Sequence, residues 1–144
     1  MSEPDQQHLR RLNRAAGIVH LGNALQEHLE ITRQQIQRLD QVFDILGEDA
    51  SGQTCKGMKG VIKEGDEIVS AGGDPATVDA GIISAAQRVE HYEMAGYGTV
   101  RTYAKLLGQQ EHANLLQQTL DEEVEADETL TEIANTVNVE AKAA

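Results

Sequence analysis

Apolar residues along most of this chain recur at every third or fourth position rather than at every second one. That spacing places them on one face of an α-helix, whereas strands are typically read from alternating apolar and polar runs. The pattern therefore predicts an all-α protein. The expected helices cover residues 4–16, 20–46, 57–71, 75–107 and 110–138, each to within a few residues.

Proline and glycine mark where these helices begin and end. Asp74 followed by Pro75 is a strong start signal, because the aspartate caps a free amide and the proline presets φ for the first turn. A glycine-rich stretch between Gly47 and Gly73 predicts a looser middle with a small connecting helix, and Gly108 separates the last two helices. We expect one domain, 1–144, built as a four-helix bundle with a short connecting helix and a truncated first helix.

The apolar stripe of the helix over 75–107 contains two acids at its centre. Because residues three apart lie on the same helix face, Glu90 and Glu93 would enter the same part of the core. Burying two like charges without a partner costs several kcal/mol or forces protonation. We therefore expect a compensating group. The stripe reads Ile83, Ala86, Glu90, Glu93, Tyr97, Val100, Ala104 and Leu107.

Two other helices interrupt their stripes in the same way. Glu123 lies at the centre of the last one, with Asp127 one turn on, and His28 interrupts the second, where Glu30 falls on the flank. A single acid in a stripe more often marks a helix end that reaches solvent, but three central interruptions favour a metal site or a proton-sharing network. The stripes are Leu21, Leu25, His28, Thr32, Leu39, Val42 and Leu46, and Leu116, Thr119, Glu123, Ala126, Leu130, Ile133 and Val137.

Charge and cysteine content exclude several functional classes. The chain carries 24 acids against 12 bases, a formal charge of −12, and lacks a long basic stripe, so we expect no nucleic-acid partner. No apolar run reaches about 18 residues, so we expect no membrane partner. Cys55 is the single cysteine and cannot form an internal disulfide, and the N-terminal residues lack the apolar core of a signal peptide. Together these features predict a cytoplasmic protein.

Four segments closely resemble the YciF-type bacterial stress-response proteins of the ferritin-like superfamily. They are DAGIISAAQRVEHYEMAGYGTVRTYAKLLG, LLQQTLDEEVEADETLTEIA, EHLEITRQQIQRLDQVFDILG and CKGMKGVIKEGDEIV. The resemblance implies a ferritin-like bundle, a homodimer or higher oligomer, and a dinuclear site for iron, manganese or another divalent metal that handles iron or peroxide under stress. The metal ligands that it implies are His28, Glu90, Glu93 and Glu123, together with Glu30 and Asp127.

The chain departs from this family pattern on the side of its first two helices. Relatives have a longer first helix whose glutamate supplies a ligand, and that position falls at about Ser2 or Glu3 here. Ile31 stands where relatives tend to carry a second acid, and Arg33 offers no histidine to complete a Glu-x-x-His motif with Glu30. These departures put the metal site in question.

A second function therefore stays open, a metal-free bundle that acts through homo- or hetero-association. A short first helix would leave apolar surface in need of a partner. Glu90 and Glu123 would then pair with Arg88 or Arg101, or share protons. Neither hypothesis assigns a catalytic residue. The apolar surface would come from Leu25, Leu39 and Phe43.

Overall fold

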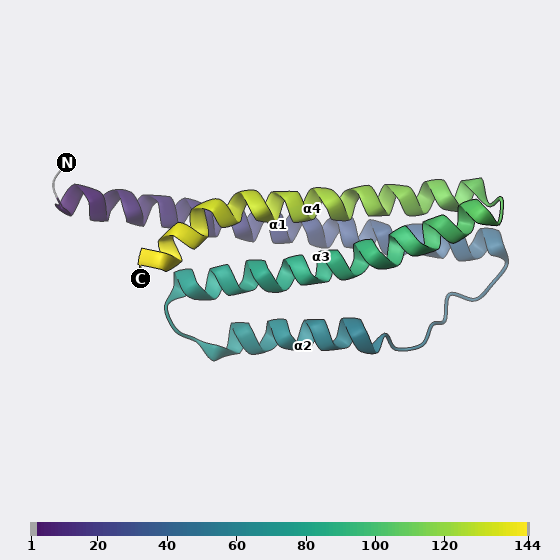
Figure 1. Ribbon diagram of the computed structural model, residues 1–144, viewed down its shortest axis with the longest axis horizontal. Helices are drawn as coiled ribbons and strands as arrows, with labels where there is room; N and C mark the ends of the chain where they lie inside the picture. The colour runs from purple at the N-terminus through teal and green to yellow at the C-terminus, as the bar shows by residue number, and fades with distance from the viewer. Residues whose placement is uncertain (1–2, 144) are drawn as a thin grey trace.

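The computed structural model of the chain describes residues 3–143, and the side chains from residue 17 onward. The described chain forms four helices and no strand: α1 (Glu3–Leu46), α2 (Lys56–Ala71), α3 (Pro75–Leu106) and α4 (Gln110–Ala143) (Figure 1). This confirms the prediction of an all-α, four-helix fold. Among these helices, none combines the length and apolar character that crossing a bilayer requires.

The first helix differs from the prediction. The two helices expected over 4–16 and 20–46 form one continuous helix, so the separate truncated first helix is wrong and the connecting helix α2 is the fourth of the fold. Gly17 lies inside α1, where a Cβ atom would be 3.4 Å from Val137 Cγ2 of α4. A small residue there suits the close approach of two helices, and tertiary packing outweighs the low helix propensity of glycine. Glu3 lies outside the described side chains.

The predicted start of α3 is confirmed. The Asp74 side chain accepts a hydrogen bond from the Thr77 N–H at 3.1 Å, and Pro75 occupies the first turn. Gly108, in the turn between α3 and α4, has a φ of 72°, a left-handed conformation that favours glycine. Local sequence signals therefore fix these two boundaries.

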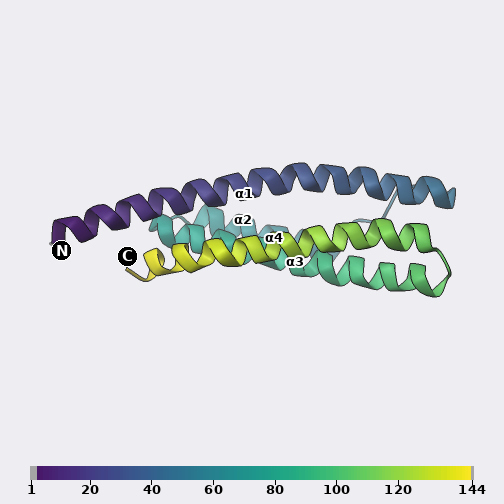
Figure 2. The same ribbon diagram turned by 90° about the horizontal axis from the view of Figure 1, so that it is seen from above.

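The helices form an open arrangement around an α3–α4 hairpin. α3 and α4 pack along their length, α1 lies mainly against α4, and α2 lies against α3 (Figures 1 and 2). Within the described residues, α1 and α2 do not approach each other. The arrangement brings the middle of α1, α3 and α4 together and leaves one side of α1 without a neighbouring helix.

The buried residues form two apolar clusters with a polar layer between them. Leu21, Ile83, Leu130 and Val137 make one cluster, and Ala104, Ala113 and Leu116 make the other. Between these clusters along the helices, the buried residues are polar. They are Gln35, Glu90, Thr119 and Glu123.

Four residues of the predicted stripes are exposed instead, among them Leu25 of α1 at 37%. Leu46 and Leu107 are 45% and 77% exposed because they lie at helix ends, beyond the packed region. Val100 is 43% exposed because the neighbouring Arg101 faces α4, where its guanidinium donates a hydrogen bond to Gln117 at 2.8 Å. The stripe predicts the centre of α3 better than its C-terminal third.

Candidate metal centre

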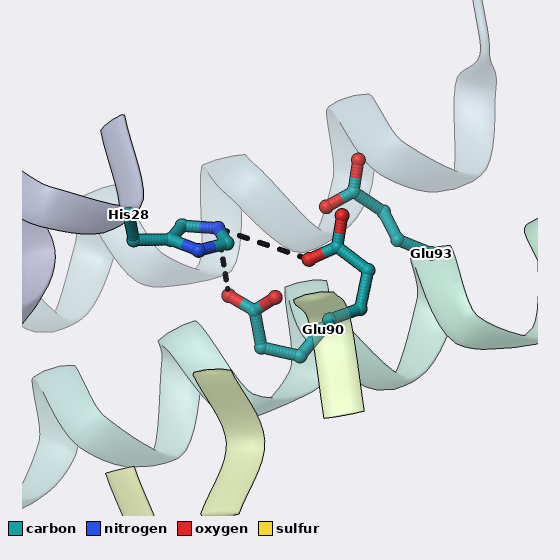
Figure 3. Close-up of side chains that lie close together, drawn as sticks. His28, Glu90 and Glu93 are labelled. Carbon is teal, nitrogen blue, oxygen red and sulfur yellow. Dashed lines mark ion pairs between the residues drawn. The ribbon is translucent and has the colours of Figure 1, made fainter. Parts of the chain in front are cut away.

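Four side chains from three helices converge in the polar layer. His28 comes from α1, Glu90 and Glu93 from α3, and Glu123 from α4, and one donor atom of each lies within 4.8 Å of the others. Figure 3 shows His28 reaching toward the carboxylates, with Glu90 and Glu93 on the same helix. Glu90 and Glu123 are 2% and 0% exposed, so the centre of the cluster is shielded from water. The sequence predicts all four residues.

Helix geometry explains why these side chains meet. Glu90 and Glu93 are three residues apart, so both project from one face of α3 toward α4 and α1. His28 Nε2 lies 3.3 Å from Glu90 Oε1 and 3.9 Å from Glu123 Oε2. The imidazole is thus placed between two acids that belong to different helices.

The cluster leaves several buried polar atoms without partners. Within the described chain, Glu90 Oε2, both carboxylate oxygens of Glu123 and His28 Nδ1 have no hydrogen-bond partner. An unsatisfied buried polar group costs about 1–3 kcal/mol, and more when it is charged. A bound cation would satisfy the carboxylate oxygens, which is the chemistry that this arrangement fits.

The acids respond to burial by holding protons. Burial, followed by the nearby Glu123 carboxyl group and the surrounding carboxylate charges, raises the pKa of Glu90 from 4.5 to about 9. Burial and the charge of Glu123 raise the pKa of Glu93 to about 7. Burial, with the charge of Glu93, also raises the pKa of Tyr97 to about 12. Without a cation, Glu90 therefore keeps a proton at neutral pH, and Glu93 keeps one in part.

A polar group beside the cluster was not predicted. Arg38 of α1 donates two hydrogen bonds of 2.8 Å to the Glu122 carboxylate and one of 2.7 Å to Thr119 Oγ1. Gln35 Nε2 donates to Glu122 at 3.2 Å. Burial alone would raise the pKa of Glu122, but the bonds from Arg38 and Gln35 and the Arg38 charge outweigh it and hold the pKa below its usual value. Arg38 is therefore engaged with Glu122 rather than with the four-residue cluster.

One sequence signal could have found this group. Gln35 lies seven residues after His28 and is 2% exposed, so it belongs to the inward face of α1. The predicted stripe passes from Thr32 to Leu39, a step of seven residues, and omits the inward position between them. A stripe read by period alone would include it.

Two predicted ligands lie outside the cluster. Glu30 is exposed and pairs with Arg33, because residues two apart on a helix differ by about 200° in direction and His28 points inward. Asp127 accepts a hydrogen bond of 3.1 Å from the Gln87 amide and lies 3.2 Å from His91 Nε2. Its charge still contributes to the raised pKa of Glu90. The structure does not bring either residue to the other four.

The arginine partners expected for a metal-free bundle are also engaged elsewhere. Arg88 lies 3.4 Å from Glu64 of α2, and Arg101 contacts Gln117. The expected pairing of Arg88 or Arg101 with Glu90 or Glu123 is therefore wrong. Of the basic groups described, His28 is the one that contacts these acids.

The helical fold agrees with comparisons to known proteins. Residues 2–144 match the family described as Domain of unknown function (DUF892), and the chain belongs to that family. Protein YciF of Escherichia coli (strain K12) is 41% identical over 136 residues, which cover 93% of this chain and 82% of YciF. The resemblance to YciF-type proteins is thus confirmed.

Two solved structures share the fold. The crystal structure of the E. coli stress protein YciF matches with a TM-score of 0.76 and 39% identity, over 89% of this chain and 86% of that one. YcfI from Rhodopseudomonas palustris matches with a TM-score of 0.75 and 39% identity, over 87% of this chain and 82% of that one. Both matches extend over most of the length of this chain.

Proposed function

We propose that this chain is a metal-binding stress-response protein of its family, which holds a divalent cation between His28, Glu90, Glu93 and Glu123. The observation that carries the proposal is the set of buried, unpartnered donor atoms from three helices. Three carboxylates gathered in a core without an arginine or lysine are costly, and a cation offsets that cost directly.

The donor set narrows the choice of metal. One imidazole nitrogen with carboxylate oxygens suits Fe²⁺, Mn²⁺ and Zn²⁺, whereas Ca²⁺ and Mg²⁺ favour sites of oxygen alone. The family resemblance favours iron. Four protein ligands leave coordination positions open on an octahedral ion, and open positions are what iron or peroxide handling requires.

The number of available ligands favours one cation per chain. Bundle cores that hold two iron ions typically use six residues, two glutamates and two Glu-x-x-His motifs. Among the described residues the cluster has four, because Glu30 pairs with Arg33 and Asp127 with Gln87 and His91. We therefore propose a mononuclear site in place of the dinuclear one that the resemblance implies.

Metal analysis of variants tests the proposed function. Protein purified without chelator and then incubated with Fe²⁺ under anaerobic conditions should contain about one metal ion per chain after desalting. Glu123→Gln removes a ligand charge at the most buried position, and we expect a loss of at least tenfold in affinity, as for other buried ligand changes. Glu30→Gln, which changes an exposed acid of α1, is the matched control and should bind normally.

The proposed function fails on either of two results. One is the absence of bound Fe²⁺, Mn²⁺ and Zn²⁺ in the wild-type protein after reconstitution. The other is equal binding by the Glu123→Gln and Glu30→Gln variants.

An exposed apolar stripe on α1 supports association as a second candidate function. Ile18, Leu25, Leu29 and Ile36 are 43%, 37%, 44% and 55% exposed. Their spacings of seven, four and seven residues place them on one side of the helix, and α1 does not contact α2 in the described part of the chain. Such a stripe favours a homodimer or higher oligomer, as predicted. Of the surface expected from the sequence, Leu39 instead packs against the core.

Sedimentation equilibrium tests this association. The wild-type protein should be an oligomer at micromolar concentration, and Leu29→Glu with Ile36→Glu should shift it toward monomer. The matched control is the same charge change at exposed Gln34 and Gln37. A wild-type protein that is monomeric at micromolar concentration would contradict association as a function.

A further inference from the structure

A cavity between α1 and α4 leads from the surface to the metal-site cluster. It has a volume of about 120 Å³. Glu27 of α1 and Glu125 of α4 belong to its wall and are exposed, whereas Glu90 and His28 belong to the same wall and are part of the cluster. The cavity therefore joins solvent-facing acids to the buried donors.

Two buried atoms in this wall lack a partner. Glu90 is 2% exposed, and its Oε2 has no hydrogen-bond partner among the described residues. His28 Nδ1 is likewise unpartnered. These unpaired atoms are evidence for a ligand at the inner end of the cavity. This evidence is separate from the presence of acids at the outer end.

The α3–α4 side of the cluster is closed. Glu123 is fully buried, and α3 and α4 pack against each other along their length. A cation approaching between these helices would have to separate them. The cavity beside the half-buried His28 opens the cluster on the α1–α4 side.

The volume of the cavity and the charge of its wall determine which ions can enter it. A single water needs about 10–15 Å³ of such space, so the cavity has room for a small hydrated ion. Among the described residues, Glu27, Glu90, Glu122 and Glu125 contribute carboxylates to the wall, and no lysine or arginine lines it. A narrow opening lined by one sign of charge raises the local concentration of the opposite ion and repels anions.

We propose that this cavity is the route by which a divalent cation reaches the cluster, and that Glu27 and Glu125 capture the cation at its mouth. The inference rests on the proposed function, since it assigns a path to the same site. Glu122 is held by Arg38 and lies farther in, so it forms a fixed part of the wall.

Loading kinetics with Co²⁺ test the route. Binding to the apoprotein is followed in a stopped-flow spectrometer through the visible absorption of the coordinated ion. The double variant Glu27→Gln/Glu125→Gln should load on the order of tenfold more slowly than wild type at low salt, with the same final Co²⁺ content. Glu128→Gln/Glu132→Gln makes the same charge change at exposed α4 positions away from the cavity and should load at the wild-type rate.

A second variant tests the path itself. Ala126 is half-buried in the cavity wall, and Ala126→Leu would narrow the cavity without changing its charge. This variant should load slowly at both low and high salt, whereas the defect of Glu27→Gln/Glu125→Gln should shrink at high salt through screening. Thermal unfolding of each variant checks that the fold is kept.

The outcomes separate the route from the site. If wild type binds Co²⁺ and both the acid variant and Ala126→Leu load at the control rate, the route is wrong and the metal site stands. If wild type binds no Co²⁺, the proposed function is overturned and the route with it. Slow loading of both variants with an unchanged end point supports the proposal.

Discussion

At the scale of single residues, the central feature is the carboxyl pair of Glu90 and Glu123 beside His28. Burial and the neighbouring charges raise the pKa of Glu90 to about 9, so the metal-free protein keeps a proton there at neutral pH. A cation must displace that proton and the one that Glu93, with a pKa of about 7, holds in part. Metal affinity should therefore rise with pH between about 6 and 9.

The same shifts predict how the stability of the metal-free protein depends on pH. Since the pKa of Glu90 rises from 4.5 to about 9 on folding, the folded state binds more protons than the unfolded state between these values. The free energy of unfolding should fall as pH increases in this range, by up to about 1.4 kcal/mol per pH unit for one proton. Glu90→Gln should flatten this dependence.

Urea unfolding of the metal-free protein at pH 5, 7 and 9 measures the effect. Glu30→Gln, at an exposed position, should keep the wild-type slope. A wild-type stability that stays constant or increases from pH 5 to pH 9 would contradict the raised pKa of Glu90.

Periodicity predicts the four residues of the cluster because acids and a histidine at core positions stand out against apolar neighbours. It does not predict the Arg38–Glu122 pair, since charged residues on a helix flank look the same whether they are solvated or paired across an interface. The helix period also places Asp127 one turn from Glu123, whereas Glu30, on the flank of its stripe, is a ligand that the family resemblance implies. Their direction is set by α1 geometry and by Gln87 and His91, which the sequence does not place.

At the scale of elements, glycines inside two of the helices allow a neighbouring helix to approach closely. Gly17 lets α1 approach α4, and Gly81 lets α2 approach α3, because a Cβ atom at Gly81 would lie 2.6 Å from Ile68 Cγ2. From sequence alone, a glycine predicts the end of a helix. Packing against a neighbouring helix can instead keep the glycine inside a continuous helix. This is why the predicted end of the first helix at residue 16 is wrong while Pro75 and Gly108 mark true boundaries.

The packing of α2 can be tested by adding one methyl group. Gly81→Ala should destabilise the protein by about 1–3 kcal/mol, because Ile68 must move or α2 must shift. Gly60→Ala is the matched control in α2, since nothing lies within 4 Å of its added Cβ, and it should stabilise by up to about 1 kcal/mol through helix propensity.

Chemical unfolding measures both glycine variants. We expect Gly81→Ala to retain metal binding, because α2 packs against α3 alone and supplies no residue of the cluster. Equal free energies of unfolding for Gly81→Ala and Gly60→Ala would contradict the close contact between α2 and α3 at Gly81.

At the scale of the whole molecule, the fold is an open bundle with an acidic surface. The formal charge of −12 divides into surface acids and the few that enter the core, and the latter are the physical reason for a cation. The helical fold class was predictable from periodicity, since each long helix carries a continuous stripe. The sequence did not predict which helices contact one another. An exposed apolar stripe on α1 and a buried one have the same spacing of residues.

Anomalous scattering from crystals soaked in Co²⁺ tests the central claim most directly. A mononuclear metal site predicts one strong peak per chain, within coordination distance of His28 Nε2 and of carboxylate oxygens from Glu90, Glu93 and Glu123. In crystals of the Glu123→Gln variant the peak should be weak or absent. Two peaks at the cluster would contradict the mononuclear site, and a fully empty cluster in the wild-type protein would contradict metal binding itself.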